Sequence, residues 1–150
     1  MTAPPWFYDD GGRAGAGFKG KTGDCAARAV AIATRQPYRE VYDALNVLAR
    51  TERPRGKRTR SSARDGYHSA TLRRYMASIG WRWVSCMGIG TGCTAHLREG
   101  DPLPTGRAVL RLSRHYTALI EGLVCDTHDP ARGGSRCVYG YWVEGASVQA

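Results

Sequence analysis

The sequence lacks long apolar runs and has little lysine. No stretch approaches the roughly 20 apolar residues of a membrane-spanning helix, so we expect no contact with a membrane. Residues 1–10 lack both the basic start and the apolar core of a signal peptide. Only three of the 22 basic residues are lysines, so arginine carries most of the formal net charge of +9. This excess suits contact with an acidic protein or nucleic acid.

An even set of cysteines is also missing. The five cysteines show no paired spacing; they are Cys25, Cys86, Cys93, Cys125 and Cys137. Small secreted domains held by disulfides usually carry an even number. We therefore expect free thiols and a cytoplasmic location, and we expect every cysteine except Cys25 to serve core packing.

The length of 150 residues, with 42% hydrophobic and 23% charged positions, suits one domain. Residues 1–23 are rich in glycine and proline and predict an extended lead-in, whereas residues 24–150 form the domain. Residues 50–64 are basic with almost no apolar anchor, which predicts a loop that contacts an acidic protein or nucleic acid. The candidate binding residues in this loop are Arg53, Arg55, Lys57, Arg58 and Arg60.

The periodicity places helices first and strands second. Apolar residues at helical spacing predict one helix from Asp24, a second after Pro37 and a third over 69–79. Alternating or short apolar runs then predict strands over 81–86, 107–112, 115–120, 123–125 and 136–143. The expected fold is α+β, with N-terminal helices packed on a C-terminal antiparallel β-sheet.

One cysteine has the position of a nucleophile. Cys25 falls in the first turn of the first predicted helix, where free amides and the helix dipole stabilise a thiolate; Thr22 or Asp24 is placed to cap that helix. His115 opens a strand, and a tight hairpin at Gly122 brings Asp126 beside it. These residue types in this order predict a Cys25–His115–Asp126 catalytic triad.

Two segments carry a family resemblance: residues 23–29, which read GDCAARA, and residues 107–116, which read RAVLRLSRHY. With the order of elements, they resemble the papain-like cysteine peptidase superfamily, in particular the leader peptidase domains of bacteriocin exporters and small phage-encoded papain-like proteins. The resemblance implies a papain-like fold, a peptide substrate and, for a phage protein, the bacterial cytoplasm or the virion as its location.

The sequence departs from this family at two positions. The superfamily usually has a glutamine six residues before the cysteine, and Lys19 stands there. Lys19 or Thr22 is then the candidate donor to the oxyanion. Asp129, followed by a proline, resembles the Asp-Pro run of the exporter peptidases and is the alternative acid to Asp126.

Other patterns support alternative interpretations. Cys93 with His96, and Cys125 with His128, repeat a spacing that two-thiolate, two-imidazole zinc sites use, although we expect no metal or cofactor. The strand aromatics resemble a platform for stacking nucleic-acid bases, but their alternation favours core packing. These aromatics are Trp81, Trp83, Tyr139, Tyr141 and Trp142.

Two functions follow from the sequence. The first is a thiol peptidase or related hydrolase or acyl transferase, in which His115 activates Cys25 toward a peptide or isopeptide carbonyl. The second is an inactive papain-like fold that serves as a phage virion or host-interaction protein through its basic surface.

Overall fold

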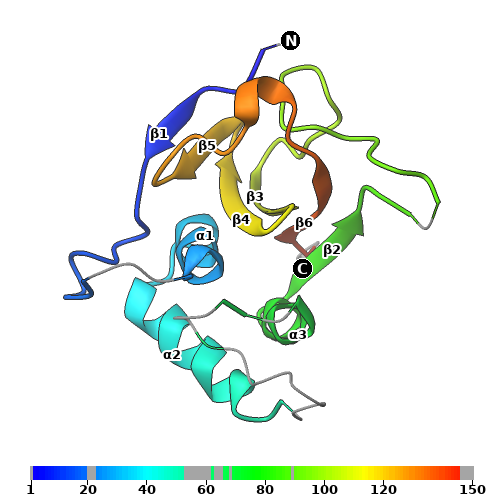
Figure 1. Ribbon diagram of the computed structural model, residues 1–150. Coiled ribbons are helices and arrows are strands. Elements are labelled where there is room, and N and C mark those ends of the chain that lie inside the picture. The colour runs from blue at the N-terminus through cyan, green and yellow to red at the C-terminus, as the bar shows by residue number, and fades with distance from the viewer. Residues whose placement is uncertain are drawn as a thin grey trace, which may run out of the picture.

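The computed structural model describes residues 2–19, 23–52, 62, 66–67, 69–88 and 90–145. Within these ranges the protein is α+β, as predicted (Figure 1). The helices are α1 (Cys25–Thr34), α2 (Tyr38–Ala49) and α3 (Ser69–Ser78), with a short 3-10 turn, η1 (Arg132–Gly134). The strands are β1 (Trp6–Tyr8), β2 (Trp81–Ser85), β3 (Arg107–Leu112), β4 (His115–Ile120), β5 (Leu123–Asp126) and β6 (Val138–Glu144). They form one sheet in the order β1-β5-β4-β3-β6-β2.

The predicted lead-in contains a strand, which corrects two expectations. β1 pairs in parallel with β5, with Tyr8 opposite Asp126, so the sheet is mixed rather than antiparallel throughout. Three consecutive aromatic residues have high strand propensity, and the glycines around them obscured this short signal. β1 lies at the sheet edge beside β5 (Figure 1), and this pairing ties the N-terminal segment to the strand that ends at Asp126.

Helix α1 packs along the middle of the sheet, against β4 and β3. The Arg107 guanidinium at the start of β3 donates to the carbonyl oxygens of Ala33 at 2.8 Å and Ile32 at 2.6 Å. These bonds satisfy carbonyls that have no partner within the helix end. The ten-residue helix is about 15 Å long, and the five residues from Arg107 to Arg111 span about 13 Å of strand. The start of α1 therefore reaches the Arg111 end of β3.

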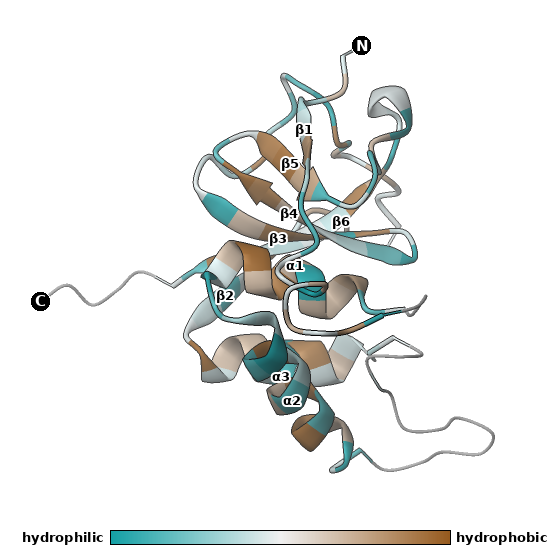
Figure 2. Ribbon diagram, turned by 90° about the vertical axis from the view of Figure 1, so that its left-hand side faces the viewer, coloured by the Kyte–Doolittle hydropathy of each residue, from teal (hydrophilic) through white to brown (hydrophobic). Residues whose placement is uncertain are grey.

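The sheet separates two apolar cores. In β3, Val109 packs with the helices, whereas its neighbours Ala108 and Leu110 pack in the second core. This is the two-residue period of a strand buried on both faces. Figure 2 shows the three helices gathered on one side of the sheet. The other core is closed by the connection between β2 and β3, through Ala95 and Leu97.

A tight turn joins β4 to β5, as predicted. Glu121 and Gly122 both have positive φ, at 50° and 83°, which suits the turns that fit the twist of a two-residue hairpin. Ala118 pairs with Cys125 across the hairpin, and the next pair along therefore sets Thr117 opposite Asp126. The hairpin register decides which side chains meet the carboxylate.

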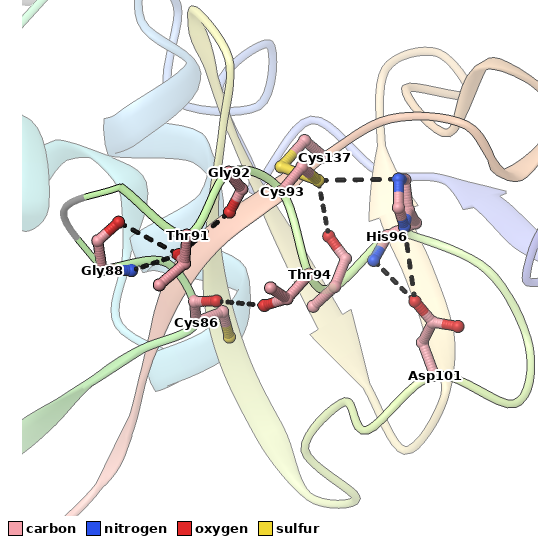
Figure 3. The surroundings of a disulfide bond; sticks show 10 residues. Cys86, Gly88, Thr91, Gly92, Cys93, Thr94, His96, Asp101 and Cys137 are labelled. Carbon is pink, nitrogen blue, oxygen red and sulfur yellow. Dashed lines mark hydrogen bonds and ion pairs between the residues drawn. A yellow bond between two sulfur atoms is a disulfide. The ribbon is translucent and has the colours of Figure 1, made fainter.

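A disulfide joins Cys93 to Cys137, so the expectation that all cysteines are free is wrong. The bond ties the β2–β3 connection to the start of β6, beside an isolated bridge between His96 and Cys137 (Figure 3). The two cysteines are 44 residues apart in the sequence, and only the fold shows that their Cα atoms lie 5.9 Å apart. Cys25, Cys86 and Cys125 carry free thiols.

The candidate binding residues of the predicted basic loop, from Arg53 to Arg60, lie outside the described residues. Among the helices that are described, none has the length and apolar character needed to cross a membrane.

Candidate active site

Cys25 is the first residue of α1 and is half-buried. Asp24 occupies the position before it but makes no side-chain bond to the helix start, so the predicted cap by Asp24 is wrong. The Asp24 side chain therefore leaves the first amides of α1 free to face a ligand. Amides at a helix start favour negative charge, both on the thiolate and on an oxygen that develops charge beside it.

His115 and Asp126 meet at the ends of β4 and β5. The Nε2 atom of His115 lies 2.7 Å from Oδ2 of Asp126, and the Thr117 hydroxyl donates to the same oxygen at 2.6 Å. The backbone N–H of Thr127 donates to the other carboxylate oxygen at 2.7 Å. Asp126 is buried and its carboxylate orientation is fixed by these bonds. It in turn fixes the imidazole and leaves Nδ1 for the thiol.

The thiol of Cys25 and the imidazole of His115 shift each other's pKa. Burial opposes ionisation of Cys25, yet the hydrogen bond and charge of His115, the Tyr116 backbone and the Arg28 charge outweigh it and lower the Cys25 pKa. Burial likewise opposes a charged His115, but Asp126 and Cys25 raise its pKa to about 9. Both shifts favour a thiolate–imidazolium pair, the form in which a cysteine is nucleophilic near neutral pH.

The contact with His115 also favours the charged form of Asp126. Burial alone raises the pKa of a carboxyl group, but the hydrogen bonds from His115 and Thr117 and the His115 charge more than offset that effect. The Asp126 pKa therefore lies below its ordinary value. A charged carboxylate stabilises the imidazolium through the whole neutral range.

A buried cluster around Asp24 supports the start of α1. The Asp24 carboxylate is 1% exposed and bonds Arg28, Arg13 at 3.1 Å and the Tyr38 hydroxyl at 2.6 Å. Arg28 also lies 3.9 Å from Oδ1 of Asp126. The Arg28 guanidinium thus connects Asp24, the residue before Cys25, to Asp126.

A cavity of about 370 Å³ opens onto the thiol and the imidazole. Cys25 and His115 both line it, together with Arg111, Arg114 and Tyr116. Its remaining wall consists of Gly23, Ala26, Gly66, Tyr67, Ser69, Leu112 and Tyr139. The reactive pair is therefore accessible to a small group such as a peptide carbonyl and its neighbouring side chains.

A larger cavity of about 710 Å³ lies elsewhere, near the end of α1 and β2. Its lining includes Arg35, Arg82 and Glu144 but no cysteine or histidine. The smaller cavity, by contrast, is lined by the Cys25 thiol and the His115 imidazole.

The other predicted site residues are placed differently. Lys19 is exposed, its carbonyl accepts a bond from Arg13 at 3.1 Å, and its side chain does not line the cavity. Thr22 lies outside the described residues. Asp129 is exposed and accepts from the Ala131 N–H at 3.0 Å, in a turn rather than on the imidazole. Of the two candidate acids, Asp126 is the one that reaches His115.

The zinc interpretation does not fit the structure. Cys93 is joined to Cys137, so its sulfur is not a free thiolate ligand. Among the described residues, one set of three groups has ligand atoms that could hold a metal ion: His115, Asp126 and His128, within 4.8 Å of one another. Its first two members are hydrogen-bonded to each other, and the His128 ring lies 5.0 Å from that of His115.

Several residues of the site were missed in the sequence. Thr117 carries a recognisable signal, because it lies two residues after His115 and therefore on the same strand face. Arg28 lies one helical turn after Asp24, a spacing that permits their ion pair. Arg13 has no sequence signal for its contact with Asp24, because the loop that carries it folds back only in the tertiary structure.

Comparison with known proteins found no matching family model, no matching curated protein and no matching solved structure.

Proposed function

We propose that this protein is a papain-like cysteine peptidase or related thiol hydrolase or acyl transferase. The observation that supports it best is the joint arrangement of Cys25, His115 and Asp126: a thiol with lowered pKa, an imidazole with raised pKa and a buried carboxylate on that imidazole. An ordinary structural cysteine has none of these partners.

The reaction follows from the charges. The Cys25 thiolate attacks the carbonyl carbon of a peptide or isopeptide bond; a C–S bond forms and the carbonyl π electrons move to oxygen. Amides at the start of α1 stabilise that oxyanion. The intermediate collapses, the C–N bond breaks, and the His115 imidazolium gives its proton to the leaving amine.

The second half of the reaction regenerates the thiolate. Neutral His115 removes a proton from water, the hydroxide adds to the thioester carbonyl and the C–S bond breaks. The products are a carboxylic acid and the Cys25 thiolate beside the His115 imidazolium. Attack by an amine instead of water gives transamidation with the same residues, so one site serves both outcomes.

The proposal extends to partners and location. Its substrate is a protein or peptide, and residues 50–64 are proposed to contact an acidic protein or nucleic acid. The proposed location is the cytoplasm of a bacterial host, or the virion of a phage. The Cys93–Cys137 disulfide is a bond that oxidising environments preserve, so it disfavours the reducing cytoplasm. Quantifying the free thiols of the protein in freshly lysed cells tests whether this bond forms there.

Selective alkylation tests the proposed nucleophile. At pH 6 we expect iodoacetamide to modify Cys25 about 100-fold faster than Cys86, which is also half-buried but whose pKa burial raises. Peptide mapping by mass spectrometry measures both rates in one sample. His115→Ala should remove the preference, because burial then dominates the Cys25 pKa. Equal rates at the two cysteines in the unmodified protein would contradict the proposal.

Turnover needs a separate experiment. A peptide library incubated with the protein should show new termini that are absent with the Cys25→Ala variant, while the Cys86→Ala variant, the matched control, should retain the cleavage. Alkylation without any cleavage, deamidation or amine transfer would favour the alternative of an inactive papain-like binding protein.

A further inference from the structure

The cavity that holds the reactive pair has an uneven charge. Arg111 and Arg114 both line it, and no acidic side chain of the described residues does. His115 adds a third positive charge whenever it is protonated, although the Cys25 thiolate balances that one. The two arginines therefore leave the wall with a net positive charge.

These arginines differ from the other arginines near the site. Arg13 and Arg28 each form an ion pair with the buried Asp24 carboxylate. Neither Arg111 nor Arg114 has an ion-pair partner among the described residues. A guanidinium that lines a cavity without a carboxylate partner can form a two-pronged bond to an incoming one.

The backbone fixes both arginines at the cavity. Arg111 pairs with Tyr116 across β3 and β4, and its guanidinium lies 5.8 Å from the centre of the Tyr139 ring, another wall residue. Arg114 has φ of 56° in the turn between those strands, directly before His115. Their positions are therefore set by the same hairpin that positions the imidazole.

We propose that Arg111 and Arg114 form a carboxylate-binding subsite, and that the substrate is an acidic peptide with an aspartate, a glutamate or a terminal carboxylate next to the scissile bond. This inference rests on the proposed function, since it names the substrate class of the same nucleophile. In this proposal, the cavity wall formed by Tyr67, Tyr116 and Tyr139 contacts the methylene groups of the substrate's acidic residue.

Two alkylating reagents of nearly equal size test the subsite. Iodoacetate and iodoacetamide both form a bond from the Cys25 sulfur to a methylene carbon and release iodide, but only the first carries a carboxylate. We expect the rate of iodoacetate divided by the rate of iodoacetamide to be higher at Cys25 than at the free amino acid cysteine. Arg111→Gln and Arg114→Gln together should lower that ratio by about three- to tenfold, the effect of two partly exposed charges.

The control is Arg74→Gln, which removes one positive charge by the same substitution, at an exposed position on α3 outside the cavity. It should leave the ratio unchanged. A ratio that the double variant does not alter, or that Arg74→Gln lowers equally, would overturn the subsite. That result is distinct from failure of the proposed function, in which iodoacetamide itself modifies Cys25 no faster than Cys86.

A substrate-like pair gives the second measurement. Peptidyl acyloxymethyl ketones that differ only in glutamate or glutamine beside the reactive carbonyl should inactivate the protein at different rates, with glutamate faster. The double variant should remove this difference while still reacting with the glutamine reagent. Equal inactivation by both reagents in the unmodified protein would exclude selection for an acidic residue.

Discussion

The two faces of the sheet are stabilised by different interactions. On the helix side, the buried Asp24 carboxylate binds Arg13 and Arg28. Beside it, Cys25 at the start of α1 interacts with His115 at the end of the sheet. On the other side, an apolar core is closed by a loop segment and the Cys93–Cys137 disulfide. We therefore expect the Cys25–His115 pair to respond to pH and the apolar side to respond to reduction.

The reason for this division is physical. Buried charges are sensitive to the loss of one partner, because the remaining charge is left without compensation in a site of low polarity. On the other side, the disulfide that closes the apolar core acts by limiting the unfolded chain. Each of the following changes removes one of these interactions.

The largest effect is expected for Asp24→Ala. The substitution leaves Arg13 and Arg28 without their shared carboxylate in a site that is nearly closed to solvent. We expect a loss of about 3–5 kcal/mol in the free energy of unfolding, measured by urea denaturation. Glu40→Ala, which removes an exposed acid from α2, is the control. A loss below about 1 kcal/mol would show that the Asp24 cluster does not stabilise the helix side.

The next effect concerns the other face. Replacing Cys93 and Cys137 by serine removes a link between residues 44 apart, which should cost about 2–4 kcal/mol of unfolding free energy. Because neither cysteine lines the cavity, the alkylation rate of Cys25 should remain within about twofold. Dithiothreitol added to the unmodified protein should reproduce both results. A large change in Cys25 reactivity would show that the two sides are coupled.

The smallest effect is a shift in titration. Asp126→Asn keeps a hydrogen-bond acceptor but removes the charge that favours the imidazolium, so the His115 pKa should fall from about 9 by about one unit or more. Histidine ring NMR as a function of pH measures this, with the resonance assigned from a His115→Gln variant. An unchanged midpoint would show that the Asp126 charge does not determine the protonation of His115.

The same pKa gives the sign of a stability effect. His115 has a folded pKa of about 9, above its ordinary value of 6.5. Its contribution to folding is therefore full below about pH 6.5 and is lost as pH rises through about 9. Asp126→Asn should weaken the dependence of the unfolding free energy on alkaline pH. The Cys93/Cys137 serine variant should keep that dependence, so the two changes have separable effects.

The predictions from sequence succeeded where local patterns decide the structure. Helical spacing identified α1 after Asp24, and the hairpin at Gly122 followed from turn chemistry. They failed where partners are distant in the chain. β1 lies in a glycine-rich segment, and the disulfide joins cysteines that have no paired spacing, so neither has a local signature.

The sequence by itself determined the α+β class, the helix that begins at Cys25, the strand that begins at His115 and the strand that leads to Asp126, because each depends on neighbours a few residues away. Only the tertiary structure decided that Asp126 rather than Asp129 reaches the imidazole, that Asp24 bonds arginines instead of capping its helix, and that Arg111 and Arg114 share the thiol's cavity. Those outcomes depend on hairpin register and on the direction in which α1 crosses the sheet, which arise only when the elements pack together.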